Sequence, residues 1–184
     1  MPALDTPLDT ATLVARARDG DARAYEEVVR RYQAPIYRLG LRMLSSTVDA
    51  EDVAQEVFLT AWRRLPRLRD DAAFAGWLYR ATTNRCLNLI RARRPVADVE
   101  LDTRESPSAD GGPEQAAEAG ARLSALVSAL GALTPEQRAC WLLREIHGRS
   151  YDEIARTIGT TATTVRGRIA RARAVLAEVM SPWR

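Results

Sequence analysis

The sequence predicts an all-α protein made of two small helical domains, which a flexible acidic linker joins. Apolar side chains recur at three- and four-residue intervals along most of the chain, which is the spacing of one face of a helix. Residues 96–118 break this pattern, because they are rich in proline and glycine and hold seven acidic residues against one arginine. Residues 150–173 then fit two helices joined by a tight turn, so the C-terminal domain is predicted to be a helix-turn-helix.

The composition indicates a soluble globular protein. Of the 184 residues, 46% are hydrophobic and 28% are charged. No apolar run approaches the roughly 20 residues needed to cross a bilayer, and the N-terminus carries acids in place of the basic start of a signal peptide. We therefore expect a cytoplasmic protein. Cys86 and Cys140 lie far apart and form no CxxC pair, so we expect them to be reduced and buried.

The N-terminal domain is predicted to span residues 21–95, after an extension, residues 1–20, with a short helix from Thr10 to Arg18. Asp21 is placed to cap a long helix whose apolar residues keep helical spacing. Pro35 lies inside that spacing. Because proline lacks a backbone N–H and clashes with the preceding turn, we expect it to kink or interrupt the helix.

A third helix is expected from about Asp49 to Leu65, with two different sides. Its apolar side, which we expect to be buried, consists of Ala54, Val57, Phe58, Ala61, Trp62 and Leu65. Asp52, Gln55 and Glu56 gather on an adjacent polar side. The helix therefore presents carboxylates and an amide on one face.

A fourth helix is expected from about Asp71 to Arg94, with Phe74, Leu78, Cys86 and Ile90 directed inward. Residues 63–94 hold nine arginines against two aspartates. Arginines suit the C-terminal end of a helix because of its dipole, but that benefit is confined to the last turn and these arginines begin far upstream. Few acids are near in sequence, so the block predicts a basic surface rather than a salt-bridged one.

The C-terminal domain is predicted to span residues 119–184 and to contain a helix that supports the helix-turn-helix. Thr134 and Gln137 form a capping-box pattern, in which each side chain bonds the backbone amide of the other residue. Pro135 occupies the first turn, where its missing N–H costs nothing. The helix continues through Trp141, Leu142 and Ile146, and we expect it to pack against the helix-turn-helix.

The helix-turn-helix itself begins with a second capping box, formed by Ser150 and Glu153. Gly159 stands where a helix stop needs a residue that tolerates positive φ. The second helix is expected to bury a stripe of Val165, Ile169, Ala172, Leu176 and Val179.

Four arginines of the second helix lie off this stripe or on its flanks: Arg166, Arg168, Arg171 and Arg173. A duplex major groove admits such a helix, and a guanidinium can bond a guanine edge or neutralise phosphates. Arginine-rich helix faces are also common as solvated surfaces, but the capped short helix and tight turn favour DNA binding.

Four motifs in order resemble bacterial sigma factors of the extracytoplasmic-function group, in the sigma-70 family. They are DAEDVAQEVFLTAW at 49–62, FAGWLYRATTNRCLN at 74–88, LTPEQR at 133–138, and YDEIA at 151–155 with TVRGRIARAR at 164–173. The resemblance implies a protein that binds core RNA polymerase and directs promoter recognition, strand opening and transcription initiation.

The resemblance also implies roles for particular residues. Those facing the clamp coiled coil of RNA polymerase are Asp52, Gln55 and Glu56; those contacting the −10 element as a melted strand are Asn84, Arg85, Asn88 and Arg91; those reading the −35 element as duplex are Thr164, Arg166, Arg168 and Arg171. Residues 66–71 stand where the family captures a flipped base. Arg173 is left open between a phosphate contact and a structural ion pair.

Further partners follow from the same resemblance. We expect contacts with the clamp and flap of the polymerase, an anti-sigma factor, and a monomer when the protein is free. Phe74, Trp77 and Tyr79 could stack on bases, but aromatic residues at helical spacing are more often core, which we favour for Phe74 and Trp77.

Three alternatives are weighed against this hypothesis. A stand-alone helix-turn-helix regulator would bind operator DNA as a dimer without polymerase. A metal site could use Asp49, Asp52 and Glu56, but carboxylates at this spacing are common on solvated helices, so we expect no metal or other cofactor. An enzyme is not expected, because the lone His147 has no catalytic partner in a recognisable motif.

Overall fold

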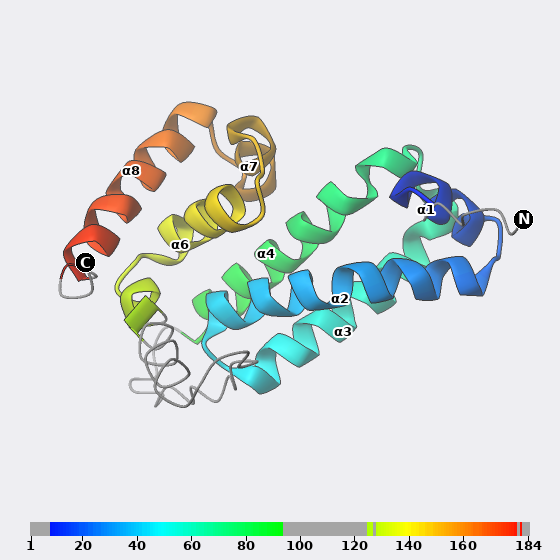
Figure 1. Cartoon of the computed structure of the whole chain (residues 1–184), viewed down its shortest axis with the longest axis horizontal. Coiled ribbons are helices and arrows are strands. Elements are labelled where there is room, and N and C mark those ends of the chain that lie inside the picture. The colour runs from blue at the N-terminus through cyan, green and yellow to red at the C-terminus, as the bar shows by residue number, and fades with distance from the viewer. Residues whose placement is uncertain (1–7, 94–124, 127, 180, 182–184) are drawn as a thin grey trace, which may run out of the picture.

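The computed structural model describes residues 8–93, 125–126, 128–179 and 181 of the chain. These described residues form helices and turns with no β-strand, which confirms the predicted all-α class. They gather into an N-terminal unit and a smaller C-terminal unit (Figure 1). The linker predicted at residues 96–118, and the start of the domain predicted from residue 119, lie outside the described residues.

In chain order, the N-terminal unit consists of α1 (Thr10–Arg18), α2 (Ala22–Leu44), α3 (Thr47–Arg64), the short 3-10 turns η1 (Leu65–Arg67) and η2 (Asp71–Ala73), and α4 (Phe74–Ala92). The C-terminal unit consists of α6 (Pro135–Trp141), the π turn η3 (Leu142–Ile146), α7 (Tyr151–Ile158) and α8 (Ala162–Val179). Within the described ranges, none of these helices combines the length and the apolar character that crossing a membrane requires.

Local capping sets the helix starts in the N-terminal unit. The carboxylate of Asp21 accepts a hydrogen bond from the amide of Ala24 at 3.1 Å, which confirms the predicted cap of α2.

Pro35 does not interrupt α2, because the helix runs unbroken through it. Val28 and Ile36, on either side of the proline, are both fully buried, and this tertiary packing holds the helix together despite the missing backbone bond.

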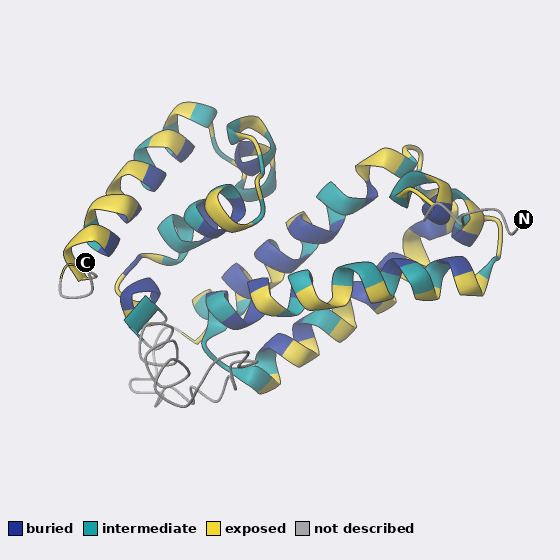
Figure 2. Cartoon of the chain, viewed as in Figure 1, coloured by how far each residue is buried: buried dark blue, intermediate teal, exposed yellow. Residues whose placement is uncertain are grey.

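The core of the N-terminal unit lies where α2 packs against α1, α3 and α4. Buried residues line the faces that meet, and exposed residues line the outer faces (Figure 2). Gly40 lets α2 and α3 approach closely, because a Cβ at this position would lie 3.4 Å from the Cα of Ala50. Among the residues predicted to point inward from α4, Phe74, Leu78 and Cys86 are buried, whereas Ile90 is half-buried.

The C-terminal unit buries one stripe of α8, made of Val165, Ile169, Ala172 and Leu176 as predicted. The burial predicted for Val179, by contrast, is wrong. Val179 is 39% exposed, because it ends the last turn of α8. Ile146 is 46% exposed. It closes η3, where the amide of His147 bonds the carbonyl of Leu142 at 3.2 Å, and the extra residue in this turn rotates Ile146 away from the core.

Both cysteines are free and buried, as predicted. Burial raises the pKa of the Cys86 thiol to about 12 and that of the Cys140 thiol to about 11. Because the thiolate is the reactive form, neither side chain is suited to redox or nucleophilic chemistry at neutral pH.

Arg138, the fourth residue of α6, forms hydrogen bonds that connect the two units. Its Nη1 donates to the backbone carbonyl of Met43 near the end of α2 at 2.7 Å. Its Nε donates to the carbonyl of Leu130 at 2.8 Å, and its Nη2 donates to that of Gly131 at 3.3 Å. One half-buried guanidinium therefore joins backbone groups that lie far apart in the sequence.

Tyr79 of α4 forms the second contact between the units. The guanidinium of Arg149 lies over its ring, 4.3 Å from the centroid. The ring of His147 lies 4.8 Å from the same tyrosine ring. Burial lowers the pKa of His147 to about 4, and the charges of nearby arginines act in the same direction. His147 is therefore neutral at physiological pH and acts as a packing residue.

Candidate nucleic-acid interface

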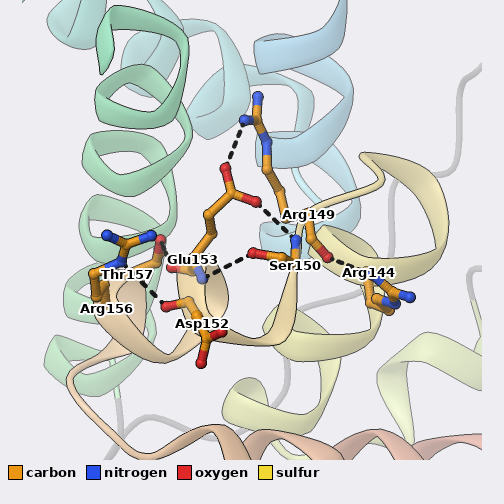
Figure 3. Close-up of polar contacts among 7 residues, drawn as sticks. All are labelled: Arg144, Arg149, Ser150, Asp152, Glu153, Arg156 and Thr157. Carbon is orange, nitrogen blue, oxygen red and sulfur yellow. Dashed lines mark hydrogen bonds and ion pairs between the residues drawn. The ribbon is translucent and has the colours of Figure 1, made fainter. Parts of the chain in front are cut away.

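The short helix α7 begins and ends at the predicted signals, and Figure 3 shows the contacts around its N-terminal cap. The Ser150 Oγ accepts from the Glu153 amide at 3.2 Å, and the Glu153 carboxylate accepts from the Ser150 amide at 2.8 Å. The hydrogen bond from the Ser150 amide is the main reason that the pKa of Glu153 is lowered. Gly159 ends the helix with a φ of 68°. These contacts fix the angle at which the chain enters α8.

The four predicted reading residues of α8 do not share one face. At about 100° per residue, Thr164, Arg168 and Arg171 fall within about 60° of one another on one flank of α8. Arg166 lies on the other flank, with its guanidinium 5.0 Å from the centroid of the Tyr151 ring. Arg168 lies beside Cys140, whose pKa it lowers against the stronger effect of burial. Arg166 and Arg171 are exposed, whereas Thr164 and Arg168 are half-buried.

Arg173 belongs to the fold of the C-terminal unit. Its Nη2 donates to the Glu145 carboxylate at 2.7 Å, and this hydrogen bond raises the pKa of the arginine. Of the two alternatives left open by the sequence, the structure shows the structural ion pair.

A groove of about 480 Å³ runs between α3 and α4 on the N-terminal unit. Three of the four predicted −10 residues line it, namely Asn84, Arg85 and Asn88. Arg91 does not, and instead approaches Glu136 of α6 at 3.6 Å and donates to the Asn88 Oδ1 at 3.4 Å.

Two arginines of the groove, Arg64 and Arg80, were missed by the sequence reasoning. The spacing of Arg80, Asn84 and Asn88 at four-residue intervals on one helix was the signal that could have included Arg80. Arg80 has no ion pair among the described residues, and Arg64 lies 5.9 Å from the Trp77 ring centroid. Both cations are available to a polyanion.

A second cavity, of about 390 Å³, adjoins this groove at the loop between α3 and α4. Its wall includes Phe74 and Trp77, whose rings stack with centroids 6.5 Å apart. Phe74 is buried, which confirms its place in the core, but Trp77 is only half-buried and lines both cavities. Trp77 is therefore shared between the core and the cavity. An aromatic wall with arginines at the rim suits a flat, unstacked base.

The loop that borders this cavity is anchored from α1. Arg18 donates to the Asp71 carboxylate at 2.7 Å and lies 3.5 Å from the carbonyl of Leu68. The Asp70 carboxylate accepts from the Ala72 amide at 3.0 Å. These bonds give residues 66–71 a defined shape.

The outer face of α3 is partly apolar, which the sequence reasoning missed. Asp52, Gln55 and Glu56 are exposed as expected. Val48 is 66% exposed and Leu59 is 50% exposed.

Trp62 was predicted to be buried, but it is 42% exposed, because it packs at the rim against Tyr25 with ring centroids 4.8 Å apart. The exposed residues at positions 48, 52, 55, 59 and 62 alternate by four and three, which is the spacing of a coiled-coil seam. We call these five residues the α3 seam.

The carboxylates near the α3 seam have partners on α4. Both oxygens of Asp49 accept from Arg93, at 2.6 and 2.7 Å, and the hydrogen bond from Arg93 is the main reason that the pKa of Asp49 is lowered. Glu56 accepts from the Arg85 Nε at 2.7 Å. In the described part of the chain, no three His, Cys, Asp or Glu side chains lie close enough together to hold a metal ion.

The fold and these surfaces define a helix-turn-helix DNA-binding protein with an additional helical unit. The family Sigma-70 region 2 matches residues 28–96, and the family Sigma-70, region 4 matches residues 123–176. The ECF RNA polymerase sigma factor SigE of Mycolicibacterium smegmatis is 37% identical over 180 residues, covering 96% of this chain and 69% of that protein.

Two further relatives agree. The RNA polymerase sigma-H factor of Pseudomonas aeruginosa is 35% identical, covering 92% of this chain and 93% of that protein. The ECF RNA polymerase sigma-E factor of Escherichia coli is 34% identical, covering 95% and 96%. The chain therefore belongs to the sigma-70 family of RNA polymerase sigma factors, in the extracytoplasmic-function group. As a member of this group it directs transcription initiation by RNA polymerase, and the family is generally not catalytic.

Solved structures have the same fold. CnrH, in a complex with the cytosolic domain of CnrY, has a TM-score of 0.71 and 28% identity, and the match covers 94% of this chain and 97% of that one. The sigma factor RpoE of Bartonella quintana, in a complex with the anti-sigma factor NepR, also has a TM-score of 0.71, at 20% identity, covering 85% and 96%.

Proposed function

We propose that the α3 seam and the neighbouring Glu56 dock on the clamp coiled coil of core RNA polymerase. The observation that carries this proposal is the four-three alternation of exposed residues along α3. Leu59 and Trp62 offer apolar area at one end of the seam, while Asp52, Gln55 and Glu56 offer acceptors to a basic partner. A coiled coil presents a matching seam with the same spacing.

The groove between α3 and α4 is proposed to hold the melted strand of the −10 element. Asn84, Arg85 and Asn88 would contact the strand, and the newly identified Arg64 and Arg80 would neutralise its phosphates. The cavity beside residues 66–71 would receive one flipped base against Trp77. Strand opening would then be driven by binding energy to the unstacked form.

The flank of α8 that carries Thr164, Arg168 and Arg171 is proposed to read the −35 element as duplex. These three residues would face base edges, and Arg166 on the other flank would contact phosphates or the groove wall. The regions proposed are residues 21–95 for polymerase and the −10 element, 96–118 for the linker and 119–184 for the −35 element and the polymerase flap, after the extension 1–20.

Further partners are proposed from the family. CnrH is seen with the cytosolic domain of CnrY, which supports an anti-sigma partner for this chain. We expect this protein to act in the cytoplasm, to be a monomer when free and to have no catalytic activity of its own. The rival function, a stand-alone operator-binding regulator, has no use for the exposed α3 seam.

The test is run-off transcription with purified core polymerase and a library of promoters. The proposal predicts defined transcripts that require this protein. If the folded protein binds DNA by itself but starts no transcript on any template, the operator-binding function replaces it. A Leu59→Ser variant should reduce transcription while leaving duplex binding by α8 unchanged, which separates docking on polymerase from DNA reading.

A further inference from the structure

The ion pair between Glu56 and Arg85 joins two surfaces with different partners. Glu56 extends from α3 beside the seam, and Arg85 extends from α4, 29 positions later in the chain. The Arg85 Nε donates to the Glu56 Oε2 at 2.7 Å, and the side chains are 43% and 53% exposed respectively. Both residues also line the groove proposed for the −10 strand.

This pairing changes what the groove offers to a nucleic acid. Arg85 is neutralised by a carboxylate at hydrogen-bond distance, and the carboxylate itself faces any phosphate that enters the groove. In the free protein, Glu56 therefore opposes binding of a strand twice, by occupying a cation and by repelling phosphate.

An arginine-rich protein surface would reverse both effects. A carboxylate engaged by an external guanidinium no longer holds Arg85 and no longer presents an uncompensated charge to the groove. Because the pair is solvent-exposed, the bond between Glu56 and Arg85 is weak enough to be exchanged.

We propose that Glu56 is an exchange residue that couples polymerase docking to strand binding: it pairs with Arg85 in the free protein and with the polymerase in the complex, which releases Arg85 to the −10 strand. This inference rests on the proposed function of the two surfaces. It predicts that the free protein binds promoter DNA poorly until polymerase is present.

The neighbouring carboxylates make this role specific to Glu56. Asp49 is held by Arg93 through both oxygens, away from the groove. Asp52 and Glu51 are exposed on the same helix, neither lines the groove, and neither forms an ion pair within the described residues. Glu51→Gln thus removes the same charge from α3 without touching the exchange.

The first experiment measures binding of the full-length protein, without polymerase, to fluorescein-labelled single-stranded oligo(dT). Glu56→Gln should tighten binding by about two- to fivefold, the range expected for an exposed ion pair. It should also steepen the salt dependence, with the slope of log K against log salt rising by about 0.7 for one more phosphate contact. Glu51→Gln should bind like the wild type.

A double-mutant cycle separates exchange from a general charge effect. In an Arg85→Gln background, Glu56→Gln should lose the part of its effect that comes from the release of Arg85 and keep only the part that comes from reduced repulsion of phosphate. An equal gain in both backgrounds, or the same gain from Glu51→Gln, would overturn the inference. Circular dichroism of each variant confirms the fold, and the reversed pair Glu56→Arg with Arg85→Glu provides a second variant in which the ion pair is kept.

The second experiment measures affinity for core polymerase. Glu56→Gln and Asp52→Asn should both weaken docking, whereas only Glu56→Gln should alter strand binding by the free protein. Wild-type docking by both variants would refute the proposed polymerase surface. A gain in strand binding without a loss in docking would refute the exchange while leaving the groove as a DNA site.

Discussion

Lowering the pH should destabilise the protein through one residue, His147, at the contact between the two units. Burial is the main cause of its depressed pKa of about 4, and the charges of Arg42, Arg149 and Arg38 add to it. The pKa of an unfolded histidine is near 6.5. The unfolded chain therefore takes up the proton first, so the free energy of unfolding falls as the pH drops from about 6.5 to about 4.

The size of this effect follows from the two pKa values. At about 1.4 kcal/mol for each tenfold change in proton affinity, the difference between 6.5 and about 4 corresponds to about 3 kcal/mol. Because the ring is only partly buried, this is an upper bound, and we expect about 1–3 kcal/mol. Above pH 7 the histidine is neutral in both states and contributes no pH dependence.

The assay is urea unfolding of the wild type and of His147→Gln, followed by circular dichroism between about pH 4 and pH 7. Carboxylates also titrate at the low end of this range, but they are common to both proteins, so the difference between the two curves isolates the histidine. Since His147 is the sole histidine of the chain, its imidazole NMR signal reports its pKa directly. Parallel curves for the two proteins, or a measured pKa near 6.5, would refute the reasoning.

Three further predictions concern α8 and α3. Gly167→Ala should stabilise the protein by up to about 1 kcal/mol, since the added Cβ would lie 3.8 Å from the Arg171 Nη1 and helix propensity improves; a lower melting temperature would contradict this. Leu59→Ser should change the free energy of unfolding by less than about 0.5 kcal/mol, because the side chain is half exposed, yet weaken pull-down of core polymerase; unchanged pull-down would exclude Leu59 from the seam. Arg171→Ala should weaken binding of a −35 duplex by about 1–3 kcal/mol if it reads a base, and Arg173→Ala, which loses an exposed ion pair with Glu145, should weaken it less; equal losses in gel shifts would contradict the assignment.

Helix ends were predictable because they depend on contacts within a few residues. Asp21, Ser150 and Gly159 each act on the adjacent turn, and the structure places each of them as the sequence implied. The buried stripe of α8 was equally local, since residues three and four apart fall on one face of any helix. The order of the four sequence motifs likewise made the family predictable from sequence.

Features that depend on distant packing could not be predicted. The tolerance of α2 for Pro35 depends on burial of both flanking turns, and the exposure of Trp62 depends on Tyr25 from another helix. The π turn at η3 changes the helical register by one residue and moves Ile146 to the surface. The hydrophobic pattern of the sequence does not predict such a turn.

The candidate site shows the same division. Residue types were predictable from sequence: Asn84 and Asn88 were assigned to one helix, and both line the groove between α3 and α4. Ion pairs between side chains of different helices were not predictable. Glu56 and Arg85 were assigned to separate partners from the sequence, although they contact each other. The arginines on the flanks of α8 likewise needed their neighbours, Tyr151 and Cys140, to be located.

The position of Arg138 determines how the protein can open. Of the carbonyls that its guanidinium bonds, only that of Met43 belongs to the N-terminal unit; those of Leu130 and Gly131 belong to the segment that leads into α6. Pulling the units apart therefore breaks one of these hydrogen bonds, worth about 1.5–3 kcal/mol, in addition to the contacts of Tyr79 with Arg149 and His147. The bonds to Leu130 and Gly131 would keep the Arg138 guanidinium in its orientation after such a separation, so the contact with Met43 can form again without rearrangement of this side chain.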